Sequence, residues 1–144
     1  MQTHADITLA LLKRAAELAV ADPVAGGNLA ITMPDVIPPW GAGDAPDRYL
    51  SISLFDNRPA WEAIGPGKLD QGLMQISVVW PRNNGPIEIR TAVQAVLDHF
   101  PKALLMRQGT ACVKVSGEPW AASALVEESQ TMIPVTVPWV ASSV

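Results

Sequence analysis

Three segments of this 144-residue chain carry an apolar side chain at every second position: residues 49–55, 72–80 and 131–140. Successive side chains of a strand point to opposite faces, so this spacing is typical of strands with one buried face. The segments therefore predict a sheet whose apolar face has to be covered by other elements. Trp80 and Trp139 fall on these apolar faces, and we expect both in the core.

Two segments have the spacing of helices that could cover such a sheet. Apolar residues recur at three- and four-residue intervals in residues 5–21 and again in residues 86–100. Pro86 suits the first position of a helix, where its missing N–H costs nothing, and Pro101 prevents the second helix from continuing. We expect these two helices to lie on the apolar side of the sheet.

Shorter elements complete the predicted fold. Residues 28–33 have the composition of a short strand, and residues 103–108 and 110–116 flank Gly109 as a hairpin would. The chain is thus predicted to be one α+β domain over residues 1–144, with a mostly antiparallel mixed sheet and two helices packed on one face. Long loops rich in proline and glycine are expected at the ends of the sheet.

The last predicted strand contains two prolines. Pro134 and Pro138 are an even number of residues apart, so their missing N–H groups point to the same side of the strand. A strand tolerates this only where that side is unpaired or irregular. We therefore expect residues 131–140 to form an edge strand.

Composition narrows the classes of function. Charged residues make up 17% of the chain and apolar residues 49%, whereas an average soluble domain is about 25% charged. This leaves open either a larger core or apolar surface for partners. The net charge of −4 and the lack of a basic stripe argue against nucleic-acid wrapping.

No apolar run approaches the roughly 18 residues that a membrane helix needs. The N-terminus has no basic segment of the kind that opens a signal peptide, so we expect no membrane contact. The single Cys112 cannot form an internal disulfide, which suits a reducing compartment.

No pattern of catalytic or metal-ligating residues stands out. His4 and His99 have no second ligand at helical spacing, and both are expected to be solvated surface residues. Nucleophile and phosphate-binding motifs are absent, and Cys112 lies in a predicted strand, where a packing role is expected. Glu127 and Glu128 fall in a polar loop, where solvated charge is the expected role. We expect no catalytic residue, metal or cofactor, and hence no enzyme.

The loops carry the remaining candidates. Trp40, Trp61 and Trp120 fall in segments rich in proline and glycine, and exposed tryptophan is common at protein contacts. Each could instead fold back over an open edge of the sheet. Arg58 and Lys68, in the loop of Trp61, join these three as predicted interface residues.

Several runs resemble a known family. These are Arg48-Tyr49-Leu50, the run GLMQISVVWP at 72–81, Gly85, and the run LDHFP at 97–101. From about residue 48 to 140, with a helix before them, they resemble the tail terminator (tail completion) proteins of long-tailed phages.

The resemblance implies a small α/β sandwich that forms a ring, usually a hexamer, on the head-proximal end of the tail tube. Such a ring stops further polymerisation and joins the tail to the head. The implied partners are further copies of the chain, the tail tube protein and a head-completion or connector protein. DNA would pass through without specific binding. The implied location is the virion, and the host cytoplasm during assembly.

Two alternatives stay open. One is another head-completion or tail-tube subunit. The other, from a different class, is a small-ligand binding domain that uses the loops of Trp61 and Trp120 as a pocket.

Overall fold

The structure, a computed structural model, describes residues 4–24, 26–56, 60–61 and 68–143. In this part of the chain the elements follow the order helix, four strands, helix and five strands. They are α1 (His4–Ala16), β1 (Ala30–Thr32), β2 (Tyr49–Asp56), β3 (Ala60–Trp61), β4 (Lys68–Pro81), α2 (Pro86–His99), β5 (Leu105–Gln108), β6 (Ala111–Val115), β7 (Trp120–Ala121), β8 (Leu125–Val126) and β9 (Gln130–Ser143).

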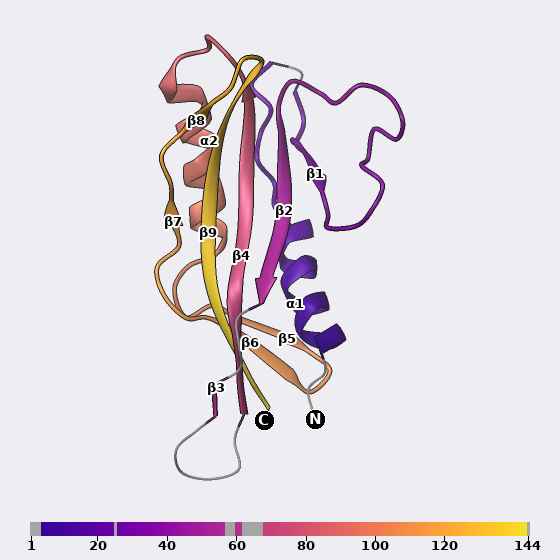
Figure 1. Cartoon of the computed structure of the whole chain (residues 1–144), viewed down its shortest axis with the longest axis vertical. Coiled ribbons are helices and arrows are strands. Elements are labelled where there is room, and N and C mark those ends of the chain that lie inside the picture. The colour runs from indigo at the N-terminus through magenta and orange to yellow at the C-terminus, as the bar shows by residue number, and fades with distance from the viewer. Residues whose placement is uncertain (1–3, 25, 57–59, 62–67, 144) are drawn as a thin grey trace.

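The sheet is mixed and mostly antiparallel, with the strand order β1-β2-β4-β9-β6-β5 (Figure 1). Only β1 and β2 pair in parallel among the named neighbours. The two longest strands, β4 and β9, pair along their length from Asp70↔Ala141 to Pro81↔Gln130. The predicted α+β fold with two helices on one face of a mixed sheet is confirmed.

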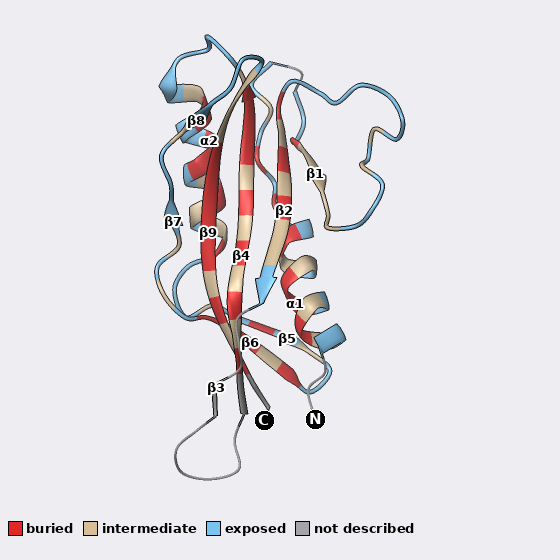
Figure 2. Cartoon of the chain, in the orientation of Figure 1, coloured by how far each residue is buried: buried red, intermediate tan, exposed pale blue. Residues whose placement is uncertain are grey.

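The core lies between the sheet and the two helices, as the alternating buried bands of the strands in Figure 2 show. Trp80 and Trp139 are only 1% and 3% exposed, which confirms that both belong to the core. The helices contribute the buried residues Ile7, Ala10, Leu11 and Ala15 from α1 and Ile89, Ala92, Val93 and Val96 from α2.

The predicted edge position of the last strand is wrong, because β9 lies between β4 and β6. Pro138 O accepts from Ser116 N at 3.0 Å and Pro134 O accepts from Ala122 N at 2.9 Å, both on the β6–β8 side. Each missing N–H therefore faces this side. β6 ends at Val115, and the next residue, Ser116, faces Pro138. In the same way β7 ends at Ala121, and the next residue, Ala122, faces Pro134. The prolines thus break the neighbouring strand into short pieces and do not place β9 at an edge.

The first helix is shorter than the predicted 5–21, because it ends at Ala16. Beyond it the chain turns back on itself, and Leu29 N donates to Val20 O at 2.8 Å. Pro23 disfavours a helical residue before it, which stops the helix from reaching Asp22. Leu18 and Val20 remain buried in the core, which explains why the apolar periodicity continued past the helix.

Two predicted loops contain short strands. β7 and β8 lie within the stretch 117–129 and pair with β9, and β3 lies within 56–70 and pairs with β4. Each has only two residues. Segments this short leave no periodicity to recognise in the sequence.

Candidate functional site

The predicted interface tryptophans lie in different surroundings. Trp120 is 48% exposed in β7 and pairs with Thr136 of β9. Trp40 is half-buried, with its ring 5.1 Å from that of Tyr49 in an edge-to-face arrangement, and so anchors the loop that carries it. The backbone of Trp61 pairs with Lys68 in β3 and β4, whereas both side chains lie outside the described residues.

Arg58 lies wholly outside the described residues. Its interface role, like those of Trp40, Trp61, Lys68 and Trp120, therefore stays a prediction. Trp120 retains the accessible area that a contact residue needs.

The sheet face turned away from the helices, called here the outer face, carries exposed apolar side chains. Partners in a strand register point to the same face, so Phe55 lies in one row with Leu73 and Pro138. Trp120 lies in a second such row and Leu125 in a third. Phe55 and Leu125 are each 50% exposed. Three large apolar groups therefore stand on this one face.

The central strands add no charge to the outer face. Antiparallel sheets usually carry polar or charged residues on the face toward water. Here the register places only uncharged side chains there: Tyr49, Ser51, Ser53 and Phe55 from β2, Leu73, Gln75, Ser77 and Val79 from β4, and Met132, Pro134, Thr136 and Pro138 from β9. The uncharged central part of this face suits contact with protein, whereas the exposed Lys114 of β6 lies on the same face beside Val140.

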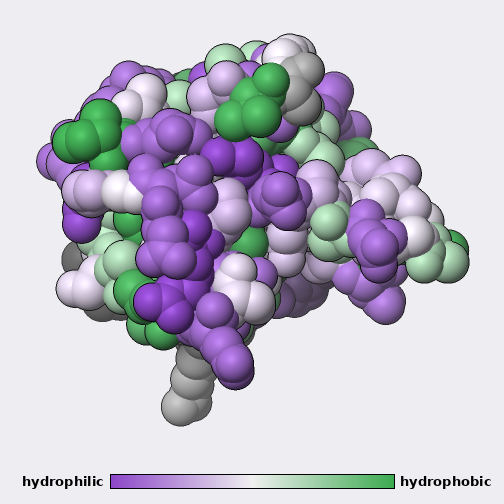
Figure 3. Space-filling model, turned by 90° about the horizontal axis from the view of Figure 1, so that it is seen from above, coloured by the Kyte–Doolittle hydropathy of each residue, from purple (hydrophilic) through white to green (hydrophobic). Residues whose placement is uncertain are grey.

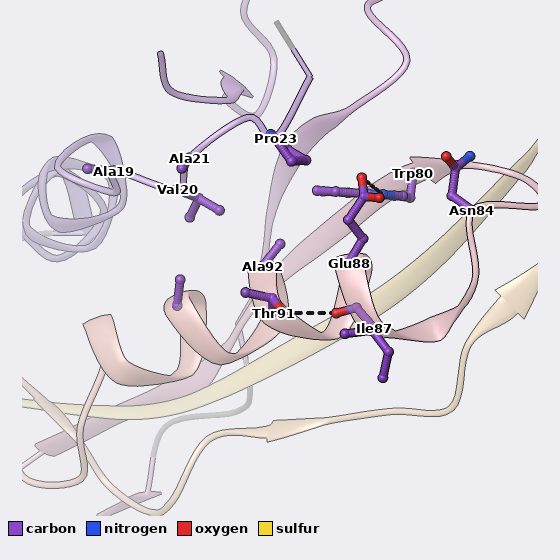
Figure 4. A pocket seen from close by; sticks show the side chains of 11 residues that line it. Ala19, Val20, Ala21, Pro23, Trp80, Asn84, Ile87, Glu88, Thr91 and Ala92 are labelled. Atoms are coloured by element: carbon purple, nitrogen blue, oxygen red, sulfur yellow. Dashed lines mark hydrogen bonds between the residues drawn. The ribbon is translucent and has the colours of Figure 1, made fainter. Parts of the chain in front are cut away.

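A groove of about 620 Å³ lies on the other side of the molecule, between α2 and the segment that follows α1 (Figure 4). Its walls are mainly small apolar side chains, among them Val20, Pro23, Ala92 and Ala95. Ile87 stands at its rim and is 76% exposed. Trp120 does not line this groove. The groove is therefore different from the pocket that the sequence suggested between the loops of Trp61 and Trp120.

A polar cluster holds one end of the groove. Arg48 is only 9% exposed, and its Nη2 donates to Glu88 Oε1 at 3.2 Å and to Asn84 Oδ1 at 3.3 Å. Its guanidinium lies 5.1 Å from the centre of the Trp80 ring, and Trp80 Nε1 also donates to Glu88 Oε1 at 3.3 Å. The cluster ties the ends of β2 and β4 to the first turn of α2.

The cluster explains several residues that carried the family resemblance. Arg48 and Trp80 are two of its members, and Gly85, with φ 74°, is the residue that leads into α2. Gly72 allows a close approach, because a Cβ there would lie 2.5 Å from Phe55 O and 2.6 Å from the Trp139 ring. These positions thus have structural roles in the fold.

His99 corrects the expectation of a solvated histidine. It is half-buried, its Nε2 lies 2.8 Å from Arg14 O, and its own backbone oxygen accepts from Arg14 Nη2 at 2.8 Å. The two contacts join the C-terminal ends of α1 and α2. His4 is exposed at the start of α1, as expected.

No group of three or more potential metal ligands gathers within the described residues. Cys112 is a free, half-buried thiol in β6. Among the helices described, none has the length and apolarity to cross a membrane.

The fold and its surfaces define a small α+β domain with an apolar outer face, a groove and a structural polar cluster. The family model described as phage tail terminator protein matches residues 6–139, and the chain belongs to this family. It is therefore a structural protein of the phage tail.

Two solved structures share the fold. One superposes with a TM-score of 0.74 at 19% identity and covers 98% of this chain and 96% of the other. A chain from the virion of a native gene transfer agent particle gives a TM-score of 0.61 at 18% identity, covering 98% and 100%. No curated protein matches the sequence.

Proposed function

We propose that this chain is the tail terminator itself. Six copies, the number that the family resemblance implies, would form a ring that caps the head-proximal end of the tail tube and joins it to the head. The family match over residues 6–139 carries this proposal. Full-length likeness to a chain from a gene transfer agent virion supports it, because that chain works inside an assembled particle. The proposed location is the head-proximal end of the tail.

The surfaces of the subunit suit a closed ring. A ring needs a heterologous contact, in which two different patches of the same chain meet between neighbours. The α2 groove offers one such patch, and the outer face, on the opposite side of the sheet, stays available to other partners. Six copies related by rotation would then leave further surfaces for the tail tube protein on one side and a head-completion protein on the other.

The charge distribution fits the passage of DNA through the ring. The chain has a net charge of −4, and β2, β4 and β9 add no charged side chain to the centre of the outer face. Neither feature attracts a phosphate backbone. The proposed role therefore requires no specific binding of nucleic acid, no cofactor and no catalytic residue.

Electron microscopy of the purified protein, alone and mixed with tail tubes, tests the function. We expect closed rings in solution or a single layer of protein at one end of each tube. Loss of the gene should give tubes of uncontrolled length without heads. Long stacked filaments of the purified protein would instead identify a tube subunit, and tube ends that stay bare would contradict the proposal.

A further inference from the structure

The three most exposed large apolar side chains of the described residues lie in two places. Ile37 is 80% exposed in the loop between β1 and β2, beside Val36 at 63%. Ile87 is 76% exposed and lies at the rim of the α2 groove. Val24 is 71% exposed and follows the wall residue Pro23 in the chain. An apolar tip and an apolar groove thus occur on the same molecule without touching each other.

The tip and the groove lie on different sides of the subunit. The loop projects beyond the β1–β2 side of the sheet, whereas α2 packs against β4 and β9 (Figure 1). Seen from above in Figure 3, the loop is the projection on the right, with hydrophobic atoms at its end. A tip on one side and a groove on the other cannot meet within one chain, but they can meet between neighbours.

The loop is held in shape before any contact forms. Pro34 and Pro38 flank the tip and each fixes its own φ. Gly41 N donates to Pro38 O at 2.8 Å, and the Trp40 ring packs on Tyr49 of β2. These contacts restrain the part of the loop that follows the tip, which lowers the conformational entropy lost when the tip is buried.

The charges on the two sides are complementary. The stretch 33–47 contains Asp35, Asp44 and Asp47, all exposed, and has no Lys or Arg. On the groove side, the lining residue Glu88 is paired with Arg48, and Asp22 adjoins the wall residue Pro23. Two exposed cations lie outside the lining: Arg82 in the turn before α2 and Arg90 three residues after Ile87 on the helix. These five groups sum to one positive charge, opposite in sign to the loop. Attraction between these groups would orient two copies as they approach.

We infer that the Val36–Ile37 tip of one copy inserts into the α2 groove of the next copy. The occupant of the groove is thus a second copy of this chain, and the contact is heterologous, so repeated rotation can close a ring. The Arg48–Glu88 pair keeps the groove open by fixing the start of α2. This inference rests on the proposed ring function and names its contact between neighbours.

Cysteine crosslinking tests the contact directly. In a Cys112→Ser background, the double variant Ile37→Cys/Ile87→Cys should give a ladder of crosslinked species with a short bismaleimide. Either single variant should give no ladder, because a heterologous contact never brings two copies of one position together. Ile37→Cys/Leu9→Cys is the matched control, since Leu9 is 49% exposed on α1, away from the groove lining.

The reaction is run on the oligomer in solution or, if the chain assembles only on tail tubes, on the tube-bound protein. A ladder from the double variant alone supports the inference. An assembled oligomer without that ladder overturns loop insertion but leaves the tail terminator function standing. A chain that never assembles, even on tube ends, overturns both.

A substitution gives an independent measure. Ile37→Ser should raise the protein concentration needed for half-assembly about tenfold or more, because an apolar side chain no longer enters the groove. The thermal midpoint should not change, since Ile37 is exposed in the single subunit. Leu9→Ser is the control, and equal effects of the two substitutions would overturn the inference.

Discussion

Arg48 shows how much a single side chain organises in this molecule. It is buried, yet it reaches Glu88 and Asn84 and lies over the Trp80 ring. Its Nε is buried and has no partner among the described residues. A buried cation is tolerated only when its partners compensate for lost hydration, so the cluster is sensitive to the removal of any member.

Replacing Arg48 with methionine should lower the free energy of unfolding by about 1–3 kcal/mol, because Glu88 and Asn84 lose a donor. We place the expectation in this range because the Glu88 side chain is 36% exposed and partly screened by water. Urea denaturation measures the change. Arg82→Met, at an exposed position, should change the stability by less than about 0.5 kcal/mol. Equal stability of the two variants would show that the cluster contributes nothing.

Gly72 is a second position where a single added atom, a Cβ, would disturb the packing of the fold. A Cβ at this residue would lie below 3.0 Å from both the Phe55 carbonyl oxygen and the Trp139 ring. Gly72→Ala should therefore destabilise the fold by about 1–3 kcal/mol, as overpacking does elsewhere. In Gly43→Ala the nearest atom would be 3.5 Å away, so this control should be nearly neutral. Thermal unfolding of both variants measures the difference, and a neutral Gly72→Ala would mean that β2 and Trp139 move apart at little cost.

At the scale of the elements, the two helices are joined at their C-terminal ends as well as through the core. Arg14 and His99 exchange contacts across 85 residues of sequence. The joint closes the end of the helical layer away from the Arg48 cluster. The helices therefore support the sheet as a connected pair.

His99→Ala should lower the stability by about 1 kcal/mol, the usual contribution of one hydrogen bond. His4→Ala is the matched control, because His4 is exposed and should have almost no effect. Chemical denaturation at neutral pH compares the two. Identical midpoints would indicate that water replaces the contact with Arg14 without any loss of stability.

At the scale of the whole molecule, the buried and exposed tryptophans have different tasks. Trp139 is 3% exposed and fills the core, whereas Trp120 is 48% exposed on the outer face. The same side-chain chemistry thus serves folding in one strand and remains accessible to partners in another.

Trp120→Ala should leave the stability within about 1 kcal/mol of the parent but weaken assembly on tail tubes, because it removes large contact area. Trp139→Ala should instead cost about 3–5 kcal/mol, as truncation of a buried tryptophan does. Thermal unfolding and tube sedimentation, measured on both variants, separate the two roles. Unchanged sedimentation of the folded Trp120→Ala protein would remove Trp120 from the interface.

The sequence by itself determined the strands 49–55, 72–80 and 131–140, the second helix and the burial of Trp80 and Trp139. These features depend on a period of two or 3.6 residues, which local spacing records. The family resemblance could also be recognised from local runs such as 72–81.

Only the tertiary structure decided which strands flank β9, where the groove lies and which partners Arg48 and His99 meet. The prolines of β9 are compatible with either an edge or an irregular neighbour, and the prediction of an edge was wrong because local spacing does not decide the strand order. The groove combines residues 19–23 with residues 84–95, and Arg48 lies 40 positions from Glu88. Contacts between such distant segments depend on how the sheet folds under its helices, and no local pattern encodes that arrangement.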